Sequence, residues 1–286
     1  MLESAAAPRP GASSDVRIAA YGDGRLQPRF DRVAVEEPLE IRLRAGGATR
    51  TAAITMRTPG SDFELAAGFL YGEGIIASLA DLAGMSFCLD DDAPEQQYNI
   101  VTVDLARQEL PELAGLDRHF MTTSACGVCG KATLDALRAR GVGPVAAGWT
   151  VAAATLLELP ERLRAAQGGF AQTGGLHAAG LFGRDGAVAT VREDVGRHNA
   201  LDKLVGWALL QRKLPLDDGV LMVSGRTSYE IVQKALCARV AVVCAVSAPS
   251  SLAVSLAREF GVTLVGFLRD GHFNAYSGAE RIVAAA

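Results

Sequence analysis

Apolar runs alternate with segments of helical periodicity through the second half of the chain. The apolar runs are residues 219–224, 240–246 and 262–267, and the helical segments between them are residues 228–239 and 249–260. Short runs that are apolar on both faces are typical of strands covered by helices, and this alternation is typical of βαβ units. The pattern therefore predicts an α/β layered core over residues 133–286, built on a mostly parallel sheet.

The first part of the chain has a different pattern. Polar and apolar residues alternate in strand-like runs at 41–44, 52–56 and 98–105, and residues 62–71 have helical periodicity. This alternation predicts half-exposed strands in antiparallel pairs, and thus a smaller mixed β-rich region over residues 15–117. Residues 1–14 are small, polar and proline-bearing, which predicts a disordered tail. A capping-box pattern at 155–158 predicts a further helix that ends near Gly168.

Composition and charge narrow the class of protein. The chain has 286 residues, 49% of them hydrophobic, and a formal net charge of -4. A general nucleic-acid binder would carry a basic excess, so this balance argues against one. The N-terminus lacks the charged start and apolar stretch of a signal peptide, and no segment approaches the ~20 apolar residues of a membrane span. We therefore expect a cytoplasmic protein without a membrane partner.

The hexapeptide CGVCGK at residues 126–131 is the most obvious place for a reaction. Its two thiols lie between flexible glycines and beside Lys131. A neighbouring ammonium group or a helix N-terminus favours the thiolate, and residues 131–140 have the composition of a helix. The pattern suits thiolate chemistry at Cys126 and Cys129, on a mobile loop over residues 118–132.

Two other interpretations of this cysteine pair stay open from the spacing alone. Structural zinc would need about four ligands, but Cys88, Cys237 and Cys244 are scattered singly along the chain. A thioredoxin-like site would want the pair directly after a strand, whereas a polar segment precedes it. Metal binding and a loop without chemistry therefore remain alternatives. Cys237 falls in a helical pattern and Cys244 in an apolar run, which predicts buried, inert thiols.

Small polar residues follow two of the predicted strands, where each strand meets a helix. Ligands of α/β sheets bind beyond such strand ends, because free amides at helix N-termini attract phosphate. For either junction alone, hydroxyls that cap the helices are a sufficient explanation, with Pro249 at the first helical position. A third polar segment, with an aromatic ring and a cation, favours a purine nucleotide with its diphosphate. The candidate residues are Ser224, Gly225, Arg226, Ser247, Ser250, Phe267, Leu268, Arg269, Asp270, Gly271 and His272.

A dense charged segment occupies residues 192–203 and is predicted to open a helix that runs to about Arg212. Charge runs of this kind are usually a solvated, salt-bridged helix start. Apolar residues within and after the segment indicate instead a buried stripe; they are Val195, Leu201, Leu204, Val205 and Trp207. On that interpretation His198 and Asn199 lie near the sheet rather than in open solvent.

Six motifs together resemble a known family, the formate dehydrogenase accessory sulfurtransferases. They are CGVCGK (126–131), TGGLHAA (173–179), EDVGRHNALDK (193–203), SGRTSYE (224–230), SAPSSLA (247–253) and GFLR (266–269). The motifs occur in the family's order, and the resemblance covers roughly residues 30 to 280. It implies a cytidine-deaminase-like α/β core joined to a smaller N-terminal region, in a homodimer.

The resemblance also implies a function and its site residues. A member of this family takes sulfur from a cysteine desulfurase and passes it to the molybdenum cofactor, in its bis(guanine dinucleotide) form, before or during insertion into formate dehydrogenase. Cys126 would then carry a persulfide, with Cys129 supporting or resolving it. The family's cofactor segment falls on residues 267–272, and GDP would be a surrogate for one half of the cofactor.

Two rival functions follow from the same residues. Zinc nucleobase deaminases carry His-x-Glu and Pro-Cys-x-x-Cys motifs, in which the glutamate moves protons. This chain has Ala179 where that glutamate would be and Ala125 in place of the proline, and its motifs occur in the opposite order. Deaminase chemistry is therefore disfavoured, although the pair could still bind zinc. The second rival is a non-catalytic chaperone that only holds the cofactor.

Overall fold

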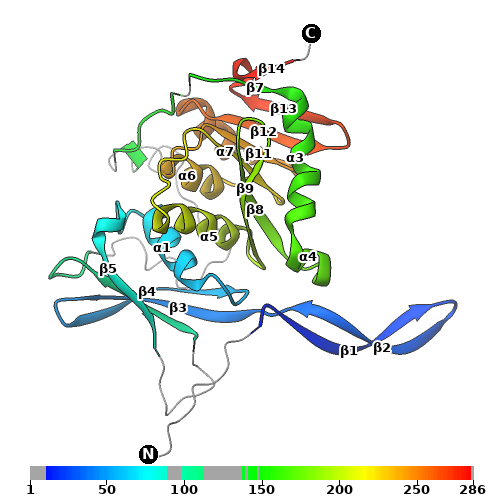
Figure 1. The fold of residues 1–286 in the computed structure, drawn as a ribbon, viewed down its shortest axis with the longest axis horizontal. Helices are drawn as coiled ribbons and strands as arrows, with labels where there is room; N and C mark the ends of the chain where they lie inside the picture. Colours follow the sequence, from blue (N-terminus) through cyan, green and yellow to red (C-terminus); the bar gives the residue numbers. More distant parts are fainter. Residues whose placement is uncertain (1–10, 89–97, 113–136, 139–140, 147, 285–286) are drawn as a thin grey trace, which may run out of the picture.

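The computed structural model describes residues 11–88, 98–112, 137–138, 141–146 and 148–284. These residues form two units, a six-stranded sheet with helices and a smaller four-stranded sheet, together with a hairpin that extends from the body (Figure 1). A mixed α/β structure was predicted, and this is confirmed. β1 begins at Ser13, so Ser13 and Ser14, which the sequence placed in the tail, belong to a strand.

The large sheet has the strand order β13-β12-β11-β10-β8-β9. Its strands are β8 (His177–Phe182), β9 (Val188–Asp194), β10 (Val220–Val223), β11 (Val242–Ala245), β12 (Thr263–Arg269) and β13 (His272–Ser277). Only β10, β11 and β12 pair in parallel, whereas β8, β9 and β13 are antiparallel to their neighbours. The prediction of a mostly parallel sheet is therefore wrong. Short turns join β8 to β9 and β12 to β13, and strands joined in this way must run in opposite directions.

Helices cover both faces of this sheet. α5 (Arg197–Leu210), α6 (Tyr229–Cys237) and α7 (Ser251–Glu259) form one layer, and α3 (Ala153–Ala166) packs on the other face, followed by α4 (Gly168–Thr173) (Figure 1). Between these two layers, β10 and β11 are buried along their whole length, and this includes Cys244 of β11. The burial predicted for Cys244 is confirmed, and it raises the pKa of that thiol. Cys237 ends α6 and is partly buried.

The smaller unit is the four-stranded sheet β4-β3-β6-β5, covered by α1. Its elements are β3 (Glu37–Ala45), β4 (Ala48–Arg57), α1 (Asp62–Gly72), η1 (Leu79–Asp81), β5 (Leu82–Phe87) and β6 (Ile100–Leu105). The predicted strands and helix are present. Antiparallel pairing holds for β3 with β4 and for β5 with β6, but β3 and β6 are parallel. The alternation of polar and apolar residues shows that one face of a strand is exposed, but it carries no information on whether neighbouring strands run in the same direction.

Two glycines join the small unit to the core. α1 packs against α5, and a Cβ at Gly206 would lie 1.8 Å from the Glu64 carbonyl oxygen. A Cβ at Gly68 would lie 1.9 Å from the Asp202 carbonyl oxygen. The two helix backbones therefore approach so closely that only glycine fits at the crossing.

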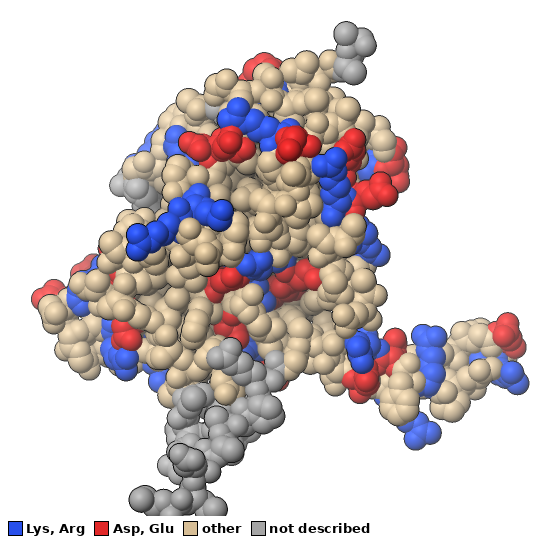
Figure 2. Space-filling view, viewed as in Figure 1, with Lys and Arg blue, Asp and Glu red and all other residues tan. Residues whose placement is uncertain are grey.

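The N-terminal hairpin extends away from the body as an arm. β1 (Ser13–Gly22) pairs antiparallel with β2 (Arg25–Ala34) over their whole length, and the arm contacts the body mainly near α4 (Figures 1 and 2). On one face Tyr21 lies opposite Leu26, and Phe30 follows along β2. These three side chains are 75%, 67% and 74% exposed. Water-exposed apolar side chains gathered on one face are typical of an interaction surface.

Short elements complete the description. β7 (Val151–Ala152) pairs with β14 (Ile282–Val283), which follows η4 (Ala279–Arg281). α3 begins at Ala153 without a side-chain cap, so the capping box predicted at 155–158 is wrong, although the helix ends close to the expected position. No helix within the described ranges is long and apolar enough to cross a membrane.

Candidate functional site at the carboxyl edge of the large sheet

The structure brings together the three polar segments that the sequence singled out. Thr227, after β10, forms a parallel bridge with Pro249, after β11, through two backbone hydrogen bonds. The Phe267 amide, near the end of β12, donates to the Ser247 carbonyl at 3.2 Å. The three segments are therefore one continuous edge, formed where β10, β11 and β12 end, as parallel neighbours require.

The third segment is a hairpin rather than a strand-to-helix junction. Phe267 and Asp270 both have a φ of 53°, and Gly271 has a φ of 76°. Asp270 and Gly271 form the two-residue turn between the paired Arg269 and His272, where a left-handed backbone is ordinary. Such a backbone is uncommon for a bulky residue like Phe267. The Arg269 guanidinium lies 5.8 Å from the centre of the Phe267 ring. Ring and cation are thus presented together at the edge of the sheet.

Not every predicted residue of this segment is available to a ligand. Leu268 is fully buried and packs in the hydrophobic core, so its side chain is directed away from the exposed edge. Leu268 lies in the stretch between Gly266 and Arg269 where the pairing of β12 with β13 shifts register. Arg269, Asp270, Gly271 and His272 are exposed.

The serines of the two junctions have different roles. The Ser250 hydroxyl accepts a hydrogen bond from the Ala253 amide at 3.2 Å and caps α7, so the capping explanation holds there. Pro249 precedes this cap and is not the first helical residue. Ser228 precedes α6 but does not cap it, because its hydroxyl lies 3.1 Å from Nε2 of His198. Ser224 accepts from the Ala178 amide at 2.9 Å and joins β10 to β8.

Two basic side chains beside these junctions were not among the predicted site residues. His177 begins β8, which is antiparallel to β10, so it lies at the same edge. Arg197 begins α5 and lies beside it; a Cβ at Gly225 would meet Nδ1 of His177 at 3.4 Å and Cδ of Arg197 at 3.5 Å. Burial, then the charges of Arg197 and His198, lower the pKa of His177 against the effect of Asp194. The imidazole is thus neutral near pH 7.

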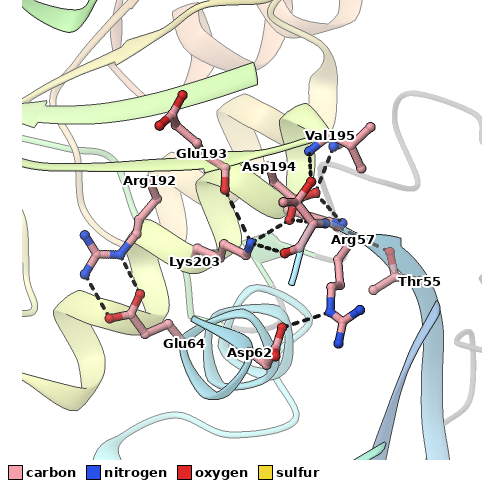
Figure 3. Close-up of polar contacts among 12 residues, drawn as sticks. Thr55, Arg57, Asp62, Glu64, Arg192, Glu193, Asp194, Val195 and Lys203 are labelled. Atoms are coloured by element: carbon pink, nitrogen blue, oxygen red, sulfur yellow. Dashed lines mark hydrogen bonds and ion pairs between the residues drawn. The ribbon is translucent and has the colours of Figure 1, made fainter. Parts of the chain in front are cut away.

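A buried ion pair holds this part of the edge in place. Nζ of Lys203 lies 2.7 Å from the Asp194 carboxylate, with 3% and 0% of the two side chains exposed (Figure 3). Asp194 ends β9 and also accepts from the amides of Thr58 and Gly196. The carboxylate therefore fixes the turn from β9 into α5, which sets the position of Arg197.

The same network reaches the small unit. Nζ of Lys203 donates to the Thr58 carbonyl at 2.8 Å, and Nδ2 of Asn199 donates to the Met56 carbonyl at 2.7 Å. Arg192 of β9 forms two hydrogen bonds with Glu64 of α1 (Figure 3). Residues 192–203 are therefore not a solvated helix start. They form a polar joint between the two units. Residues 192–194 belong to β9, residues 195–196 form the turn, and the helix begins at Arg197.

Other features lie apart from this edge. Cys126 and Cys129 are outside the described residues, as is the whole predicted loop at 118–132. Where side chains are described, no group of three or more His, Cys, Asp or Glu residues is placed to hold a metal ion. An open hollow lies at the far end of α5, lined by Tyr71, Leu79, Leu209, Arg212 and Leu214 among others.

Comparison with known proteins decides the family. The FdhD/NarQ family profile matches residues 34–283. The chain belongs to the FdhD/NarQ family. The family match begins at the last residue of β2, so most of the N-terminal arm precedes it.

Several relatives that carry the name FdhD align with almost the whole of this chain. "Sulfur carrier protein FdhD" of Mycolicibacterium paratuberculosis is 54% identical over 93% of this chain and 97% of its own length. The protein of the same name from Streptomyces coelicolor is 52% identical over 93% and 94%. The archaeal protein of this name from Sulfolobus acidocaldarius is 41% identical over 93% and 97%.

A solved structure has a similar fold. The crystal structure of a proposed formate dehydrogenase accessory protein from Desulfotalea psychrophila is 25% identical to this FdhD/NarQ chain, with a TM-score of 0.73. The likeness covers 95% of this chain and 100% of the other. Both sheets described above therefore belong to the shared fold.

Proposed function

We propose that this protein is a cytoplasmic sulfur carrier in the maturation of formate dehydrogenase. Membership of the FdhD/NarQ family and the names of close relatives support this role. The Cys126 thiolate would attack the outer sulfur of a persulfide on a cysteine desulfurase. A new S–S bond forms at Cys126, the donor's S–S bond breaks, and the desulfurase cysteine leaves as a thiolate. The exchange needs no external oxidant or reductant.

The acceptor of this sulfur would be the molybdenum cofactor in its bis(guanine dinucleotide) form, as a bound substrate. The observation that carries this proposal is the convergence of three polar segments at one sheet edge, linked by the hydrogen bonds at Thr227 and Phe267. Helix N-termini at α6 and α7 suit a diphosphate, and the Phe267–Arg269 pair suits a guanine base.

The roles within this edge follow from the exposure of each residue. Arg226 and Arg269 are exposed cations that can contact phosphate oxygens or the base. Ser247 and Ser250 would offer hydroxyl groups at the β11–α7 junction, and Gly225 allows a close approach. GDP is the simplest probe of this site, because it carries the base and the diphosphate.

We also propose that two copies of the chain associate through the N-terminal arm. An isolated two-stranded hairpin is marginal in water, so an arm of this length needs a covering surface. One face of a ten-residue hairpin measures about 34 by 10 Å. If each copy covered the other's arm, the total buried area would be about 1,400 Å², within the range of specific interfaces.

Mass spectrometry tests the sulfur-carrier proposal. The protein is incubated with a cysteine desulfurase and cysteine, and the Cys126→Ser and Cys129→Ser variants are treated in parallel. We expect one added sulfur atom on Cys126, lost on reduction, with partial loading in the Cys129 variant. Full loading of the Cys126→Ser variant would rule out this carrier. Retention of cofactor without any sulfur on the chain would indicate a chaperone.

A further inference from the structure

His177 and Arg197 form a pair of unengaged basic groups beside the proposed nucleotide site. Nε of Arg197 is buried and has no hydrogen-bond partner among the described residues, and neither does the buried hydroxyl of Thr227 on the adjoining segment. The His177 ring makes no hydrogen bond in the same part of the chain. Buried polar atoms without partners are rare, so two at one edge indicate a place where a ligand supplies the missing hydrogen-bond partner.

Gly225 packs directly beside this pair. The nearest atoms to a Cβ at that position would be Nδ1 of His177 and Cδ of Arg197, at 3.4 and 3.5 Å. These are ordinary contact distances, so an alanine would fit without strain but would occupy the space. The absence of a side chain therefore lets the β10–α6 junction lie close to both basic groups.

The position of the pair along the sheet sets its distance from Phe267. The strand order β12-β11-β10-β8 places three inter-strand steps between Phe267 and His177. Neighbouring strands are about 4.8 Å apart, so the two positions are separated by about 14 Å. A guanine base stacked at β12 would place its diphosphate over β11 and β10. The remainder of an extended dinucleotide would reach β8.

We infer that His177, Arg197 and Gly225 form a second subsite, which receives the metal-bearing part of the cofactor, beyond the diphosphate as seen from the guanine base. This inference rests on the proposed function and gives the bound cofactor a direction along the sheet edge. The metal-bearing part carries anionic sulfur and oxygen ligands. The Arg197 guanidinium offers a fixed positive charge and the neutral His177 ring offers one N–H donor, so both suit that part. Guanine binding would depend on Arg269 instead.

Calorimetry with GDP separates the two subsites. Arg269→Ala is expected to weaken GDP binding by roughly ten- to a hundredfold, as for loss of a charge-assisted contact. Arg197→Met and His177→Gln should each leave GDP affinity within about twofold, because GDP lacks the part that reaches them. A matched control is Arg184→Met, which removes an exposed arginine beyond the opposite end of β8.

A second readout measures the complete cofactor. Wild type and variants are purified from cells that produce the cofactor, and molybdenum and pterin are quantified per chain. We expect a severalfold loss in the Arg197→Met and Gly225→Ala proteins and none in Arg184→Met. Gly225→Ala removes no charged group, so it guards against a folding defect in Arg197→Met.

Three outcomes would overturn the inference. Equal weakening of GDP by Arg197→Met and Arg269→Ala would place Arg197 at the nucleotide's own phosphates. Unchanged molybdenum and pterin in the Arg197→Met and Gly225→Ala proteins would show that the subsite is not used. If wild type neither binds GDP nor retains molybdenum, the proposed cofactor site itself fails, which is distinct from failure of the second subsite alone.

Discussion

The Lys203 ammonium group lies 2.7 Å from the Asp194 carboxylate, and both side chains are almost completely buried. Lys203 belongs to α5 and Asp194 to the end of β9, and each also contacts Thr58 of the small unit. One ion pair therefore joins the two units and sets the turn that carries Arg197. The same pair that stabilises the fold positions part of the proposed cofactor edge.

Removal of one partner should be severe. Lys203→Met leaves the Asp194 carboxylate buried and unpaired, and we expect a loss of about 3–5 kcal/mol in the free energy of unfolding. Lys213→Met, at an exposed lysine just after the same helix, should change it by no more than about 0.5 kcal/mol. Chemical denaturation measures both. Equal stability of the two variants would contradict this role for the pair.

The helix crossing at Gly206 makes a second stability prediction. In Gly206→Ala the new Cβ would overlap the Glu64 carbonyl oxygen, so α1 and α5 must move apart. We expect a loss of about 1–3 kcal/mol or more, as for other overpacked sites. Gly143→Ala is the control, because nothing lies within 4 Å of a Cβ there. A wild-type thermal midpoint for Gly206→Ala would show that the two helices are not held this closely.

The pKa of His177 gives stability a dependence on pH. The folded protein holds this pKa below its ordinary value of 6.5, chiefly through burial and the charge of Arg197, with His198 adding to and Asp194 opposing the effect. As the pH falls through 6.5, the unfolded chain binds a proton that folded His177 does not, so the free energy of unfolding falls. His177→Gln should flatten this dependence in a denaturation series from pH 7.5 to 5, buffered at about half-unit steps. An identical slope in both proteins would contradict the shift.

The arm predicts a dependence of oligomeric state on two apolar side chains. Tyr21→Ser and Phe30→Ser each remove an exposed ring from the arm, and the double variant should shift the protein from dimer toward monomer. Val188→Ser is the control, because Val188 is an exposed apolar residue outside the arm. Light scattering after gel filtration measures the mass. A dimeric double variant, or a monomeric wild type, would remove the arm-mediated dimer.

Local patterns predicted the elements of the core well. The runs around β10, β11 and β12 and the helices between them are apolar on both faces or strongly periodic, so their type follows from nearby residues. The order of the strands in the sheet and their directions do not follow from nearby residues. β8 pairs with β10 across α5, and no local pattern reports that Ala179 lies opposite Val223. The hairpin arm was also missed, because Pro28 and exposed rings are unusual in a strand.

The site was predictable where it follows from chain topology and not where it depends on distant partners. The ends of parallel neighbours converge, so the segments at Thr227, Pro249 and Phe267 could be brought together from sequence. The burial of Asp194 and Lys203 depends on Thr58, just after β4, which lies far away in the chain. His177 had a usable signal, since it follows a glycine-rich turn and begins an apolar run. The antiparallel direction of β8 was needed to place it at the edge.

The transfer of labelled sulfur tests the central claim most directly. The protein is loaded with radiolabelled sulfur by a cysteine desulfurase, separated from it, and mixed with molybdenum cofactor. We predict that the label leaves Cys126 and migrates with the cofactor, and that Cys126→Ala protein transfers none. Label that stays on the wild-type chain, or that reaches the cofactor equally well with the Cys126→Ala variant, would contradict a sulfur carrier acting through this cysteine.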